Sequence, residues 1–217
     1  LLGMKAQVEG MRALMYHTAR NLDLSHHHPD EAVRRRCEGL VQLLTPICKA
    51  YGSDMGFRVT EDAIQVHGGY GYCQEYPVEQ MCRDIKISSI YEGANGIQAL
   101  DLVGRKLTMA GGALFKDYIA EMGAFIDAQT GNAVIGPWVT KLAKARDLLV
   151  KCTMKIGKAL QEGDQHYAFL VSTPYLRMFG DFSSAALLLE QALLAAEKLG
   201  PGDMASYKAR AEKDDTL

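Results

Sequence analysis

The sequence predicts an all-α protein in which an antiparallel helical bundle is followed by a second helical domain. Apolar residues recur every three or four positions along most of the chain, which is the period of an α-helix. No segment alternates like a convincing β-strand, and there is neither an internal repeat nor a low-complexity tract. Hydrophobic residues make up 48% and charged residues 23% of the 217 positions, which is typical of a folded domain and argues against global disorder.

The first two helices are delimited by acidic residues and proline. The stripe that predicts the first helix consists of Met4, Val8, Met11, Met15, Ala19 and Leu22. Asp30 and Glu31 suit the positive N-terminal end of a second helix. Pro46 lies inside the apolar stripe of that helix, so we expect a kink or break near Thr45 and a restart at Asp54.

Shorter helices are predicted beyond the second one. Gly68–Gly71 ends the second helix, and Glu75–Pro77 precedes a helix whose apolar face carries Val78, Met81, Cys82 and Ile85. Tyr91–Gly96 is a break in which Asn95 is the expected N-cap of the next helix. The apolar face of that helix is expected at Ile97, Leu100, Val103 and Leu107.

Gly111 and Gly112 mark a boundary, so we expect one domain over residues 1–110 and an additional one over residues 111–217. Two apolar stripes of the additional domain suit antiparallel helix packing: Phe115, Ile119, Met122 and Ile126, then Trp138, Leu142, Ala145, Leu149, Cys152, Ile156 and Leu160. Pro174 predicts a break in the last helical region, and Gly200–Gly202 its end.

Charge and cysteine usage exclude several classes of protein. The 24 basic and 26 acidic residues leave a net charge of −2, which provides no basic field for nucleic acid or anionic lipid. The longest apolar runs are too short for a membrane span. Five scattered cysteines without paired spacing predict free, mostly buried thiols and a reducing, cytoplasmic location. His26–His28 are expected in a solvated loop, and no metal site is predicted.

The first residues of the chain also bear on its function. It opens with Leu1, Leu2 and Gly3, without an initiator methionine and without the charged start of a signal peptide. We therefore expect a piece of a longer protein.

Two glycine-containing breaks are candidates for chemistry. In Gln65–Tyr72, adjacent glycines allow backbone N–H groups to approach a ligand, and together with Gln65 they could line a pyrophosphate; the alternative is a glycine C-cap and a turn. In Tyr91–Gly93, a carboxylate beside an aromatic ring and a flexible glycine is suited to act as a general base; the alternative is an exposed turn carboxylate.

The order of several short motifs is more specific than either break alone. These motifs are Ala63–Tyr72, Tyr76–Glu79, Arg83–Ile87 and Ile90–Gln98. Together they resemble the C-terminal helical domain of acyl-CoA dehydrogenases, and the resemblance covers residues 1–110. Residues 112–217 are similar, by position and helicity, to the extra C-terminal helical domain of a large-subunit branch that includes 3-methylmercaptopropionyl-CoA dehydrogenases.

The resemblance implies an FAD-dependent α,β-desaturation of an acyl-CoA in fatty-acid metabolism, with electrons passed to an electron-transfer flavoprotein. Glu92 would remove the α-proton while a hydride moves to flavin N5, its backbone N–H would polarise the thioester carbonyl, and Tyr91 and Gly93 would line the substrate. Cofactor contacts are implied for Gln65, Val66, His67, Gly68 and Gly69, toward an FAD held mainly by a neighbouring subunit, and for Ala94, Asn95, Gly96 and Ile97 near the flavin nucleotide. A homo-oligomer, at least a dimer, follows from a shared cofactor site.

The sequence departs from the family pattern at Ala94, where threonine is usual, so that residue is assigned a cofactor role only through its backbone. Some relatives carry the base on an earlier bundle helix that this chain lacks, and the retained Glu92 favours the usual location. Two other functions stay open: an acyl-CoA oxidase on the same scaffold, which passes electrons to oxygen, and a non-catalytic helical assembly module. The 217-residue chain alone is expected to have little activity.

Overall fold

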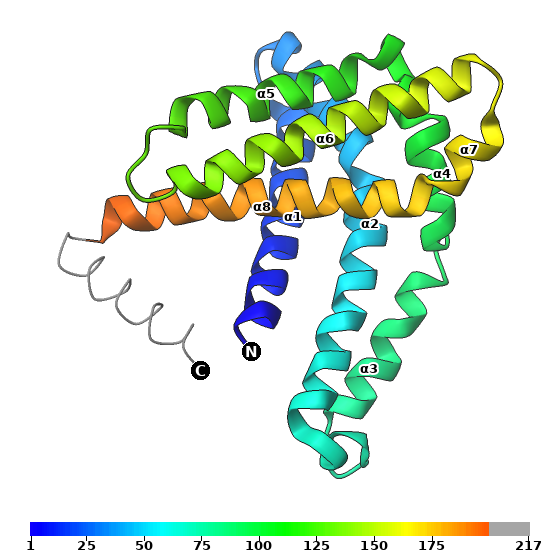
Figure 1. The fold of residues 1–217 in the computed structure, drawn as a ribbon, viewed down its shortest axis with the longest axis vertical. Coiled ribbons are helices and arrows are strands. Elements are labelled where there is room, and N and C mark those ends of the chain that lie inside the picture. Colours follow the sequence, from blue (N-terminus) through cyan, green and yellow to red (C-terminus); the bar gives the residue numbers. More distant parts are fainter. Residues whose placement is uncertain (200–217) are drawn as a thin grey trace.

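The computed structural model describes residues 1–199, and every regular element within them is helical, which confirms the predicted all-α class (Figure 1). The bundle consists of α1 (Leu2–His27), α2 (Glu31–His67), α3 (Val78–Lys86) and α4 (Asn95–Gly104). A second layer consists of α5 (Ala113–Gln129), α6 (Gly136–Gln161), α7 (Gln165–Leu170) and α8 (Ser172–Lys198). Short 3-10 turns lie at η1 (Gly68–Tyr72), η2 (Ile87–Ser89) and η3 (Lys106–Gly112).

The two layers cross each other. Helix α8 contacts α1, α2 and α4, and the ribbon shows it running across α1 and α2 while the lower half of α2 projects away with α3 beside it (Figure 1). One hydrophobic core includes residues from both layers, among them Leu44, Leu102 and Phe179. The projecting end of α2, with α3, is therefore one part of the fold that the second layer does not cover (Figure 1).

Helix α2 begins as predicted but is not broken by proline. The Asp30 carboxylate caps it by accepting a hydrogen bond of 2.8 Å from the Ala32 N–H. The helix then runs through Pro46 to His67, so the expected break near Thr45 and restart at Asp54 are wrong. A proline inside a helix costs about 3 kcal/mol. Leu43, Leu44 and Ile47, beside Pro46, are fully buried, and their packing outweighs that cost.

The buried face of α1 differs from the predicted stripe. Val8, Met15 and Leu22 are exposed, whereas Thr18 and Asn21 are buried alongside Met11 and Leu14. The two polar side chains donate hydrogen bonds to carbonyls one turn back, Thr18 to Leu14 at 2.9 Å and Asn21 to His17 at 2.8 Å. Because these bonds satisfy them, they can be buried at little cost, and counting apolar residues alone places the stripe on the wrong face.

The start of α4 also differs from the prediction. Ala94 is the N-cap and Asn95 is already the first helical residue, so the predicted capping role of Asn95 is wrong. Its side chain faces α2 instead of the helix end. Ile97 and Leu100 are exposed, and the buried residues of α4 are Asn95, Ala99, Leu102 and Val103. At the end of η3, Gly111 and Gly112 adopt left-handed conformations and turn the chain into α5.

An aromatic cluster forms the centre of the second layer. Phe179 is fully buried, and its ring lies 5.3 Å from Tyr118, 5.9 Å from Phe115 and 6.2 Å from Tyr175, measured between centroids. The Tyr118 hydroxyl donates to Ser183 Oγ at 2.7 Å, so its one buried polar group is satisfied. The cluster therefore gives the second layer a buried centre that is part of the common hydrophobic core.

Other predictions for the second layer are mostly confirmed. Phe115, Met122 and Ile126 are buried as expected on α5, and Leu142, Leu149 and Ile156 on α6, but Trp138 is 56% exposed. Pro174 does not break a helix; it lies in the first turn of α8, where proline is tolerated. The predicted end at Gly200–Gly202 lies outside the described residues, and α8 itself ends at Lys198.

Four further predictions concern the cysteines, the histidines, metal binding and membranes. All five cysteines are free, as predicted, but the expectation that most are buried is wrong: only Cys37 is buried, Cys73 is exposed, and the other three are partly exposed. His26 and His27 form the last turn of α1, not a loop. Within residues 1–199, no group of three His, Cys, Asp or Glu side chains is arranged to hold a metal ion. No helix of the described chain combines the length and apolarity that crossing a bilayer requires.

Candidate functional site

The loop between η2 and α4 carries the predicted base. Glu92 has a φ of 54°, a left-handed conformation that is uncommon for a residue with a side chain, and Gly93 follows with a φ of 85°. Glu92 is exposed, and among residues 1–199 its carboxylate makes no hydrogen bond or ion pair. Such backbone conformations occur at functional sites where the surroundings hold a residue in place. The loop thus presents a carboxylate that is free to meet a ligand.

The first turn of α4 fixes this loop from one side. The Ala94 carbonyl accepts hydrogen bonds from the N–H groups of Ile97 at 2.8 Å and Gln98 at 3.1 Å. The first N–H groups of a helix have no partner inside the helix, and in α4 these belong to Asn95 and Gly96. A helix end of this kind is suited to an anionic group such as a phosphate.

The Asn95 side chain connects the loop to α2, which sequence reasoning missed. Its Oδ1 accepts a hydrogen bond of 2.8 Å from Lys49 Nζ, and its Nδ2 donates to Asp54 Oδ1 at 2.7 Å. Ser53 Oγ and the Ala50 carbonyl also lie within hydrogen-bond distance of the amide. The partners lie more than 40 residues away in sequence, so no local pattern signals the contact.

The second predicted group lies at the tip of the α2–α3 hairpin. Gly68 is the C-cap of α2 with a φ of 62°. The glycine C-cap, which was the alternative to a ligand-binding role for this segment, is therefore present. A Cβ added at Gly68 or Gly69 would meet nothing within 4 Å, so both backbones are open to a ligand. At Gly71 a Cβ would lie 2.6 Å from the Ile64 carbonyl oxygen, and that glycine serves the turn itself.

Side chains around this tip are solvent-exposed. Val66 and Tyr70 are exposed, and one ring nitrogen of His67 lies 2.8 Å from the Ala63 carbonyl oxygen. The rings of His67 and Tyr70 lie near Tyr76, at centroid distances of 6.1 and 5.6 Å. The tip is therefore held together by backbone turns and an exposed aromatic group.

The structure does not bring the two predicted groups together. Asn95 contacts α2 at Asp54, and Gln65 follows eleven positions later, about 17 Å further along the helix axis at 1.5 Å per residue. Neither Glu92 nor the glycine pair lines any of the five main cavities of the described residues. Within one chain, the two groups can therefore contact the same ligand only if that ligand is extended. Otherwise they contact two different ligands.

A cavity with one charged wall lies beside the Glu92 loop, between α2, α4 and the start of α8. It has a volume of about 520 Å³, and its charged wall consists of Asp54, Arg58, Glu61, Lys86 and Arg177. At its edge the Tyr51 hydroxyl donates to Asp181 Oδ1 at 2.9 Å. Burial, with a contribution from the Asp181 charge, raises the pKa of Tyr51 to about 12, so the phenol is neutral at physiological pH.

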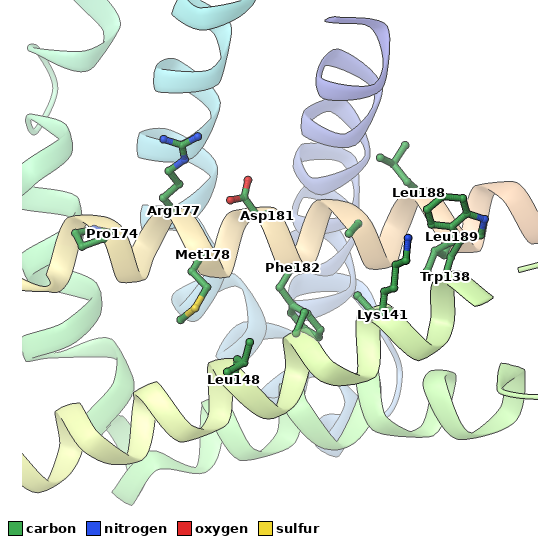
Figure 2. A pocket seen from close by; sticks show the side chains of 13 residues that line it. Trp138, Lys141, Leu148, Pro174, Arg177, Met178, Asp181, Phe182, Leu188 and Leu189 are labelled. Carbon is green, nitrogen blue, oxygen red and sulfur yellow. The ribbon is translucent and has the colours of Figure 1, made fainter. Parts of the chain in front are cut away.

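A larger, apolar groove lies between α6 and α8, in the second layer (Figure 2). It has a volume of about 660 Å³; Trp138 and Leu188 lie toward one end, and Pro174 and Met178 toward the other. The sequence places Trp138 in an apolar stripe suited to helix packing, but such a stripe does not distinguish a filled helix–helix contact from an open groove. None of the predicted site residues lines this groove.

Comparison with known proteins decides the family. The profile described as "Acyl-CoA dehydrogenase, C-terminal domain" matches residues 1–107, and "Acetyl-CoA dehydrogenase C-terminal like" matches residues 118–213. The chain belongs to the acyl-CoA dehydrogenase family. Both parts of the predicted resemblance, the bundle and the additional C-terminal domain, are therefore confirmed.

Individual acyl-CoA dehydrogenases support this assignment. A butyryl-CoA dehydrogenase of Syntrophomonas wolfei is 34% identical over 92% of this chain and 32% of its own length. A 3-methylmercaptopropionyl-CoA dehydrogenase of Ruegeria pomeroyi is 34% identical over 95% of this chain and 35% of its own length. The chain thus spans about a third of the length of these relatives.

The fold is also found in a solved structure. ACDH-11 of Caenorhabditis elegans, in complex with C11-CoA, superposes with a TM-score of 0.74 over 88% of this chain and 31% of its own, at 20% identity. At that identity the similarity concerns the fold, and it extends over both helical layers.

Proposed function

We propose that this chain is the C-terminal part of an FAD-dependent acyl-CoA dehydrogenase that introduces an α,β double bond into an acyl-CoA thioester. The proposal depends on one observation above all. In a chain of this family, the Tyr-Glu-Gly loop holds Glu92 in a left-handed conformation at the start of α4, with its carboxylate exposed and unpaired among the described residues. A carboxylate presented in this way can reach a ligand bound outside the chain.

The chemistry assigned to the loop is proton abstraction. Glu92 takes the α-proton of the acyl group and holds it on a carboxylate oxygen, while its backbone N–H donates to the thioester carbonyl and stabilises the developing negative charge. Tyr91 and Gly93 line the acyl group. FAD, when bound, accepts the β-hydrogen as a hydride.

The residues assigned to FAD fit a phosphate-containing group. The unpartnered N–H groups at the start of α4, together with Ala94 and Ile97, would face the flavin nucleotide. At the hairpin tip, the open backbones of Gly68 and Gly69, with Gln65, Val66 and His67, would face the adenosine diphosphate part of an FAD held mainly by a neighbouring subunit. The wide separation of the two groups supports this division between two FAD molecules.

The remaining parts of the proposal follow from this division. A cofactor site shared between subunits requires a homo-oligomer, at least a dimer. Electrons would leave through an electron-transfer flavoprotein, and the free thiols suit a reducing, cytoplasmic location. The 217-residue chain alone is expected to have little activity, because most contacts to FAD and CoA would come from the rest of the protein.

The test is a panel of acyl-CoA thioesters mixed anaerobically with the whole protein, following loss of the oxidised flavin absorbance. We expect bleaching by at least one chain length, a rate lowered at least 100-fold by Glu92→Gln, and an unchanged rate with Glu75→Gln, a control carboxylate in another loop of the same region. Absence of bleaching across the panel would leave the assembly module as the better function. Peroxide formed in air at the rate of turnover would identify an oxidase.

A further inference from the structure

Asn95 is polar, more than nine-tenths buried, and placed three residues after the proposed base. Its amide lies between opposite charges of α2, with the Lys49 ammonium on the carbonyl side and the Asp54 carboxylate on the amino side. Both hydrogen bonds are charge-assisted, and such bonds are about twice as strong as neutral ones. The side chain therefore fixes the first turn of α4 to the middle of α2 in one orientation.

This attachment bears directly on the Glu92 loop. The Ala94 carbonyl is held by the first turn of α4, and the Gly93 carbonyl accepts a weaker hydrogen bond of 3.4 Å from the Gln98 side chain. On its other side the loop follows η2, where the Ile90 and Tyr91 N–H groups both donate to the Ile87 carbonyl. Between these anchors, Glu92 and Gly93 make no side-chain bond to α2, so Asn95 is the nearest residue whose side chain attaches the loop to that helix.

We infer that Asn95 is a positioning residue, which holds the Glu92 carboxylate in the orientation needed for proton abstraction by fixing the start of α4 between Lys49 and Asp54. The inference rests on the proposed function. It assigns the Asn95 side chain to the support of the loop and leaves only its backbone N–H for the flavin nucleotide. A base that is displaced by about 1 Å can lose about 100-fold in rate, so the effect is measurable.

The substitution Asn95→Asp tests the charge pattern. It keeps the shape and the partner Lys49 but places two carboxylates against each other at Asp54, so the first turn of α4 is pushed from α2. Adding Asp54→Asn in the same molecule restores the hydrogen bond between the two positions. The amide donor is then at position 54 and the carboxylate acceptor at position 95. Asn132→Ala is the control, because Asn132 also caps local backbone N–H groups, of Val134 and Ile135, but in the second layer.

In the whole holoenzyme we expect Asn95→Asp to lower the rate of flavin reduction at saturating acyl-CoA by about 10- to 100-fold. The FAD content and the half-saturating acyl-CoA concentration should stay within twofold. The isotope effect from α-deuterated acyl-CoA should increase, because proton abstraction becomes slower, which a loss of stability alone would not cause. The double substitution should restore most of the rate.

The inference is overturned if Asn95→Asp reduces flavin as fast as Asn132→Ala, while Glu92→Gln remains inactive; in that case the proposed function stands. If Glu92→Gln also keeps its rate, the proposed function itself fails. Should Asn95→Asp not yield holoenzyme, Lys49→Met removes the opposite anchor with Asn95 intact. A several-fold slower reduction with a raised α-isotope effect supports the inference, and an unchanged rate overturns it.

Discussion

The loops of the bundle and the core of the second layer differ in burial and in whether their polar groups have partners within the chain. Around Phe179, aromatic side chains are buried and the Tyr118 hydroxyl has a partner within the chain. At Glu92 the side chain is exposed, and at Gly68 and Gly69 the backbone is open to a ligand. The second layer has a buried centre whose packing comes from within this chain, whereas the loops carry backbone N–H groups and a carboxylate without a partner among the described residues. Substitutions in the core should therefore change stability, and substitutions in the loops should change FAD binding or the reaction with the substrate.

The largest expected effect on stability is at the contact between the layers. A Cβ added at Gly180 of α8 would overlap the Tyr51 ring of α2. Gly180→Ala should lower the free energy of unfolding by about 3 kcal/mol, measured by chemical denaturation, because two helix backbones must separate. Gly157→Ala is the control, since a Cβ there meets nothing within 4 Å, and it should stabilise the chain by about 0.5 kcal/mol. Equal effects of the two substitutions would contradict the packing described here.

A pH effect should arise at the same contact. The pKa of Tyr51 is raised from its ordinary value of 10.0 to about 12, chiefly by burial. Its contribution to stability is therefore complete below pH 10 and is lost as the pH rises toward 12. Over that interval the unfolding free energy should fall about 1.4 kcal/mol per pH unit more steeply in the natural chain than in Tyr51→Phe. Parallel pH curves would show that Tyr51 is not buried against Asp181.

The smallest expected effect on stability is at Gly69, at the tip of the α2–α3 hairpin, where FAD binding should change instead. Gly69→Ala fills open space, so the unfolding free energy should change by less than about 0.5 kcal/mol. In the whole holoenzyme it should weaken FAD binding by about 3- to 10-fold, measured by release of flavin fluorescence on dilution, because a methyl group obstructs the open backbone. Gly71→Ala, which clashes with the Ile64 carbonyl, should instead destabilise the tip. Unchanged FAD binding with Gly69→Ala would contradict the assignment of the tip to the cofactor.

Local signals in the sequence predicted several element ends, whereas the errors have both distant causes, as at Pro46, and local ones, as at Thr18. The acidic start of α2 at Asp30, its end at Gly68 and the helix beginning at Val78 were all expected from adjacent residues. The helix through Pro46 was not, because the packing that maintains it comes from other helices. The face of α1 was wrong because Thr18 satisfies its own hydroxyl.

In the candidate site, too, adjacent residues predict some features and contacts between distant residues determine others. The motif around Glu92 indicated the family directly, and the family is confirmed. The side-chain role of Asn95 was not predictable, because Lys49 and Asp54 become its neighbours only once α2 and α4 pack together. The roles of the individual site residues stay predictions.

The most direct test of the central claim separates proton abstraction from hydride transfer. An acyl-CoA with α-hydrogens but a quaternary β-carbon can lose a proton to a base, yet it has no β-hydrogen to transfer. In D₂O, the whole holoenzyme should incorporate deuterium at the α-carbon of this thioester without bleaching its flavin, and Glu92→Gln should abolish the exchange. Exchange that persists in Glu92→Gln, at the rate of the natural protein, would contradict the assignment of Glu92 as the base.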